Sequence, residues 1–164
     1  MDRWSNFFSA SGGAAAALTG LLFIAVSLRP REIRQSPLMV GRARSAFYGF
    51  AAITFVALLA LAGTSSSLIG VAQLAVAAGF LAISARFTRS AHRARHLNYR
   101  RAIVYHAGLI AVGGAGALRA VGGGARDYSV VLAVGVMLLL GIALSNSWQL
   151  VISHESDESG GGPA

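Results

Sequence analysis

Residues 86–101 carry the side chains of this sequence that could most readily do chemistry. The stretch reads RFTRSAHRARHLNYRR and contains six arginines, two histidines and no acidic residue. On a helix, His92 and His96 share one face because they are four residues apart, a spacing that zinc sites use. A zinc site needs further ligands, however, and the surrounding arginines repel cations. We therefore predict no metal site here.

The arginines of this stretch could instead bind phosphate, either in nucleic acid or in lipid headgroups. They are Arg86, Arg89, Arg93, Arg95, Arg100 and Arg101. In helical form the stretch would place most of them in one polar stripe, as in helices that lie on a membrane surface. Because apolar segments flank the stretch on both sides, lipid headgroups are the nearer phosphates. The sequence therefore predicts contact with anionic lipid headgroups and no nucleic-acid partner.

The overall composition is typical of a membrane protein. Of the 164 residues, 55% are hydrophobic and only 12% are charged, whereas ordinary soluble domains carry about 25% charged residues. Cysteine is absent, so neither a disulfide nor a thiolate site can form. The charged residues are clustered between long apolar tracts. This pattern predicts an all-α fold, a polytopic bundle of transmembrane helices.

Five apolar tracts are long enough to cross a membrane, because about 20 helical residues span a hydrocarbon core of about 30 Å. The predicted spans are residues 7–28, 45–63, 68–85, 102–121 and 129–152. The fourth span is the weakest because it is rich in glycine and contains Arg119, so a four-span fold is the alternative. Residues 1–152 then form a single transmembrane domain. The acidic, glycine-rich residues 153–164 are predicted to be a disordered tail.

The distribution of arginine predicts how the protein is oriented. Residues 29–44 hold five arginines and residues 86–101 hold six. In a five-span fold both segments lie on the same side, opposite Arg3, Arg119 and Arg126. The positive-inside rule places the arginine-rich side in the cytoplasm. The N-terminus is therefore predicted to lie outside and the C-terminus inside, with the first span retained because its basic residues follow the apolar tract.

Small residues recur every four positions in the first span, at Gly12, Ala16 and Gly20. This spacing lets two helix backbones approach closely in a membrane. The row could form an interface with a second protein or a second copy of the chain. The alternative is packing inside one subunit, which we favour because such rows are common in membrane helices rich in alanine and glycine.

The predicted spans contain few polar side chains. Tyr105 and His106 lie near one end of the fourth span and are candidates for a polar site, although such a pair is more often an anchor at the membrane interface. No Asp or Glu lies deep in any span, which disfavours proton relays and cation sites. The sequence contains no hydrolase, metalloprotease or nucleotide-binding motif. It therefore predicts no catalytic residues and no cofactor, and the protein is not expected to be an enzyme.

The first span reads FFSASGGAAAALTGLLFIAVSLRP, with paired aromatic residues, a run of small residues and an apolar core. Over residues 7–28 it resembles the first span of a group of uncharacterised small bacterial multi-span membrane proteins. The resemblance implies an integral protein of the bacterial inner membrane and brings no activity. The leading hypothesis is a small helper or scaffold subunit that acts through helix–helix contacts. The alternative is an oligomeric pore or transporter for a neutral or anionic solute.

Overall fold

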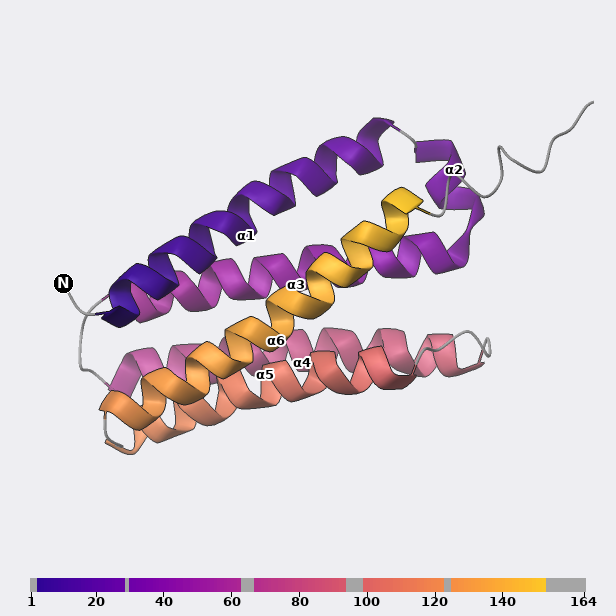
Figure 1. Ribbon diagram of the computed structural model, residues 1–164. Coiled ribbons are helices and arrows are strands. Elements are labelled where there is room, and N and C mark those ends of the chain that lie inside the picture. The colour runs from indigo at the N-terminus through magenta and orange to yellow at the C-terminus, as the bar shows by residue number, and fades with distance from the viewer. Residues whose placement is uncertain (1–2, 29, 63–66, 94–98, 123–124, 153–164) are drawn as a thin grey trace, which may run out of the picture.

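The computed structural model describes residues 3–28, 30–62, 67–93, 99–122 and 125–152, and these residues form helices without any strand. The helices are α1 (Arg3–Leu28), α2 (Pro30–Gln35), α3 (Pro37–Leu61), α4 (Ser67–Arg93), α5 (Tyr99–Ala120) and α6 (Ala125–Ile152). All except α2 are long and apolar enough to cross a membrane. Helices α3, α4 and α5 run along roughly one direction, α6 crosses them at an angle, and α2 lies at one end (Figure 1). The predicted all-α bundle with five spans is confirmed, and the fourth span is a complete helix.

Local sequence determines where several of these helices begin and end. In a bilayer an apolar segment must satisfy its backbone hydrogen bonds internally, and a helix does so. Ser36 is the N-cap of α3. Its backbone is extended, and its Oγ accepts a hydrogen bond from the Met39 amide at 3.4 Å. Pro37 follows at the first helical position, where its missing N–H is not needed. Beyond α5, Gly122 has a φ of 80°, a left-handed conformation that glycine adopts without strain.

Two segments differ from the sequence-based expectation. Helix α3 begins at Pro37 instead of residue 45, so Arg42 and Arg44 lie on the spanning helix itself. Residues 86–93 continue α4 beyond the apolar tract, and α5 starts at Tyr99, so the arginine-rich stretch consists mainly of the ends of two spanning helices. Residues 94–98 and the predicted tail at 153–164 lie outside the described part of the chain.

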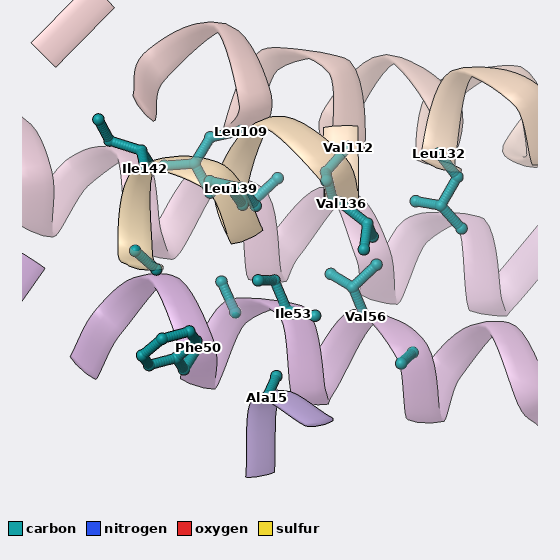
Figure 2. Close-up of a cluster of buried hydrophobic side chains, with 14 of the residues drawn as sticks. Ala15, Phe50, Ile53, Val56, Leu109, Val112, Leu132, Val136, Leu139 and Ile142 are labelled. Carbon is teal, nitrogen blue, oxygen red and sulfur yellow. The ribbon is translucent and has the colours of Figure 1, made fainter. Parts of the chain in front are cut away.

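The bundle has three central helices and two peripheral ones. Helices α3, α5 and α6 supply the large apolar side chains that are fully buried (Figure 2). In the most apolar part of α6 half of the residues are buried, whereas in α1 and α4 only 22% are. Helix α1 packs mainly on α3, and α4 mainly on α5 (Figure 1). The outer faces of α1 and α4 therefore remain open to lipid or to another protein.

Glycine allows close approach at each of the four main helix–helix interfaces. The close pairs are Gly12 with Ala57 between α1 and α3, Gly49 with Ala143 between α3 and α6, Gly70 with Gly116 between α4 and α5, and Gly108 with Gly135 between α5 and α6. A Cβ atom added to Gly70 would lie only 2.6 Å from the Gly116 carbonyl oxygen. Lipid tails are as apolar as the core, so close packing of backbones contributes much of the stability of such a bundle.

Candidate functional site

A buried polar cluster joins three helices near one end of the bundle, where α4 and α6 begin and α5 ends. We call Gln73, Arg119 and Tyr128 the Tyr128 cluster. Gln73 on α4 is completely buried, and Tyr128 on α6 is 7% exposed. The Gln73 Nε2 atom donates a hydrogen bond to the Tyr128 hydroxyl at 2.8 Å, and Arg119 Nη1 on α5 donates to the same oxygen at 2.9 Å. One phenol oxygen therefore links all three helices.

The Tyr128 cluster combines two kinds of contact. The Arg119 guanidinium carbon lies 4.9 Å from the centre of the Tyr128 ring, which adds a cation–π interaction to the hydrogen bond. Arg119 lies in the last turn of α5, and the structure holds its guanidinium against Tyr128 on α6. The Gln73 Oε1 atom is buried and accepts no hydrogen bond from the described residues. A buried polar atom without a partner costs about 1–3 kcal/mol, so the cluster is not fully satisfied by the chain itself.

Two polar pairs lie near the opposite end of the bundle. Asn146 on α6 is 5% exposed, and its Nδ2 atom donates to the Ser45 hydroxyl on α3 at 3.1 Å. Between α4 and α5, the Ser84 Oγ and His106 Nε2 atoms are 3.3 Å apart. The other ring nitrogen of His106, Nδ1, is 2.6 Å from the carbonyl oxygen of Ala102. A carbonyl can only accept, so Nδ1 carries hydrogen and, in the neutral ring, Nε2 accepts from Ser84.

Tyr105 and His106 do not form a joint site, although they are adjacent in sequence. Consecutive helical residues point about 100° apart. Tyr105 is buried and faces α3, where its Cε2 atom is 3.8 Å from the position of a Cβ on Gly49. His106 faces α4 through Ser84. The two side chains therefore contact different helices, and they lie on different faces of α5.

An apolar layer separates the two polar regions. It consists of Phe50, Ile53, Val56, Leu109, Val112, Leu132, Val136 and Leu139, each at most 1% exposed (Figure 2). Gln73 and Ser84 are 11 positions apart on α4, which corresponds to about 16 Å along a helix. Among the described residues, no polar side chain bridges this layer through the bundle core. In the described part of the chain, the buried core between the two polar regions is therefore apolar.

The predicted row of small residues is divided between two environments. Gly12 packs inside the bundle, because a Cβ added there would lie 2.7 Å from Ala57 Cβ on α3. Ala16 and Gly20 are exposed, and a Cβ on Gly20 would meet no atom within 4 Å. Packing within one subunit, the reading that we favoured, therefore applies to Gly12 and is wrong for the other two residues. The first span turns Gly20 away from the bundle.

The described part of the arginine-rich stretch lies at the end of α4 and the start of α5. Arg86 is exposed at the end of the apolar part of α4. Arg89 and Arg93 lie on the last turns of α4, and Arg100 and Arg101 lie on the first turn of α5. Arg95 and His96 lie outside the described residues. Within the described part of the chain, no group of three His, Asp or Glu side chains is arranged to hold a metal ion.

Sequence reasoning missed the Tyr128 cluster. Gln73 was visible as an isolated polar residue within an apolar tract, which in a membrane helix usually marks a contact with another helix. Tyr128 gave no such signal, because a tyrosine near a span end also fits an interfacial anchor. The two residues are 55 positions apart, and they come together only because α4 and α6 both pack on α5.

No protein-family model matches the chain, and comparisons with curated proteins and with solved structures find no match either.

Proposed function

We propose that this chain is a small helper or scaffold subunit of the bacterial inner membrane that acts through helix–helix contacts. The observation that supports this role most is the apolar layer between the two polar regions. A transporter needs polar groups along its substrate path, whereas the polar side chains here link helices to one another. The proposal includes no catalytic role, no cofactor and no nucleic-acid partner.

The outer face of α1 is the surface that we assign to the partner. It carries a row of small exposed residues, which are Ser9, Gly13, Ala16, Ala17 and Gly20. Small residues let a second helix approach until the two backbones touch, and this contact drives association between membrane helices. Helix α1 packs mainly on α3, so this row is not covered by the rest of the bundle (Figure 1). The partner is another membrane protein or a second copy of the chain.

The alternative function is an oligomeric pore or transporter for a neutral or anionic solute. Such a pore could be lined by the outer faces of several subunits. Across the middle of α4, the exposed positions are Val71, Leu74, Ala75, Ala78, Gly79 and Ala82. All are apolar, and the exposed positions of α6 from Val130 to Leu144 are apolar as well. These faces suit lipid better than water, so we favour the helper role.

Crosslinking from defined positions in native membranes tests the proposed function. A photoreactive residue at Ala17 is expected to capture one protein, whereas the same residue at the exposed Met137 on α6 is expected to capture only lipid. Gly20→Leu should reduce capture at Ala17 at least fivefold, because a large side chain keeps the partner helix away. It should leave the melting temperature unchanged, since a Cβ added at Gly20 would meet no atom within 4 Å. Equal protein capture at both positions, or none at Ala17, would contradict the proposal.

We also propose that the N-terminus lies outside and the C-terminus in the cytoplasm, because eleven arginines flank the spans on one side and three on the other. A reporter fused after Ala164 is then expected to signal a cytoplasmic location. A reporter inserted at residues 64–66 is expected to signal the outside. If both reporters gave the same location, the assignment of five crossing helices would be wrong. In this orientation the arginines of residues 86–101 contact anionic headgroups of the inner leaflet.

A further inference from the structure

The short helix α2 lies at the end of the bundle where α1 ends and α3 begins (Figure 1). Arg31 and Arg34 are both exposed on α2, while Ile33 between them is partly buried. Residues three positions apart on a helix have Cβ atoms about 5–6 Å apart, so the two guanidinium groups can reach one ligand together. The surroundings add positive charge, because residues 29–44 contain five arginines and a single acid. The corner formed by α2, the end of α1 and the start of α3 is therefore suited to an anionic group.

Apolar side chains flank the arginines of α2 on both sides. Leu28, the last residue of α1, is 76% exposed, and Leu38 in the first turn of α3 is 45% exposed. Both belong to helices that are apolar enough to span a membrane. The corner thus offers cationic groups where the spans end and apolar surface where they enter the bilayer. A phospholipid has the same two parts in the same order, whereas a nucleic acid or a free phosphate would leave the leucines exposed to water.

We propose that Arg31 and Arg34 bind the phosphate of one anionic phospholipid, whose acyl chains lie against Leu28 and Leu38. Arginine binds phosphate through two parallel hydrogen bonds, which gives this site more selectivity than a diffuse positive surface. The site is separate from the arginines of residues 86–101, which lie on α4, on α5 and between them. The inference goes beyond the proposed helper role and depends only on the placement of α2 at the membrane surface.

Photocrosslinking in nanodiscs of defined composition tests the site. The full chain, with a photoreactive residue at Leu28, is placed in equal amounts of phosphatidylglycerol and phosphatidylcholine, and lipid adducts are counted by mass spectrometry. We expect phosphatidylglycerol adducts to exceed phosphatidylcholine adducts about fivefold. Leu68 is exposed in the first turn of α4, at the opposite end of the bundle, and the ratio there should be near one.

Matched charge variants separate a defined site from general attraction. Arg31→Gln with Arg34→Gln should return the adduct ratio at Leu28 to about one. The control pair Arg86→Gln and Arg89→Gln removes the same charge on the same side and should keep most of the preference. An unchanged melting temperature in the nanodisc shows that each variant is folded, as expected for exposed side chains on a short helix.

Three results would overturn the inference. If the chain that keeps all its arginines gave equal amounts of phosphatidylglycerol and phosphatidylcholine adducts at Leu28, no anionic lipid would be selected there. An equal loss in both pairs of variants would mean that only the surface potential acts, with no site on α2. Loss of the preference on adding millimolar glycerol phosphate would mean that a soluble phosphate is the ligand and that the acyl chains contribute nothing.

Discussion

Gly70→Ala is expected to lower the free energy of unfolding by about 3 kcal/mol, because it overpacks the closest helix contact of the bundle. The added Cβ would lie 2.6 Å from both the Gly116 carbonyl oxygen and the Ala120 amide nitrogen. Both atoms belong to the backbone of α5, so neither can rotate away as a side chain could. Helices α4 and α5 would have to separate, and the contact area beside Gly70 would be lost.

The measurement is unfolding in mixed micelles of increasing denaturing detergent. Gly79→Ala is the matched control, because it makes the same change on the same helix at a position where an added Cβ meets no atom within 4 Å. Its stability should be unchanged or slightly higher, since alanine is the better helix former. If both variants were equally stable, α4 and α5 would not be in backbone contact at Gly70.

Tyr128→Phe is expected to cost about 2 kcal/mol, because it removes the oxygen that accepts hydrogen bonds from two other helices. Gln73 is completely buried, so its side chain cannot form hydrogen bonds with water instead. Its Nε2 atom would then have no partner, as is already the case for Oε1. Arg119 would keep the ring but lose its hydrogen bond to the hydroxyl. The loss should appear as separation of α4, α5 and α6 at this end of the bundle.

A double-mutant cycle with Gln73→Leu measures this coupling. In the Gln73→Leu variant there is no buried amide that could lose its hydrogen-bond partner. Tyr128→Phe should therefore lower the stability of that variant by about 1 kcal/mol less than it lowers the stability of the native chain. Tyr105→Phe deletes the same group from another buried tyrosine, for which no hydrogen bond is recorded among the described residues. It should change stability by less than about 0.5 kcal/mol. Equal effects of the two tyrosine changes, or strict additivity in the cycle, would show that the Tyr128 hydroxyl does not connect these helices.

The membrane spans could be predicted from the amino-acid sequence alone. An apolar tract in a bilayer has no water to satisfy its backbone, so it must be helical, and the rise per residue then sets its length. This is a local property, and the five predicted tracts correspond to α1, α3, α4, α5 and α6. Helix α2 was not predicted, because the six-residue segment PREIRQ is too short and too polar to give a comparable signal.

The rotation of each helix about its own axis depends on how the helices pack, and the sequence did not predict it. In a soluble bundle the apolar stripe of a helix identifies its buried face. In a membrane both the lipid side and the core side are apolar, so this periodicity carries little information about the direction of the core. Gly12 and Gly20 are two turns apart in the same row, yet the first touches α3 and the second faces outward. For the same reason Gln73 could be recognised as polar, but its partner Tyr128 could not be found until α4, α5 and α6 were packed together.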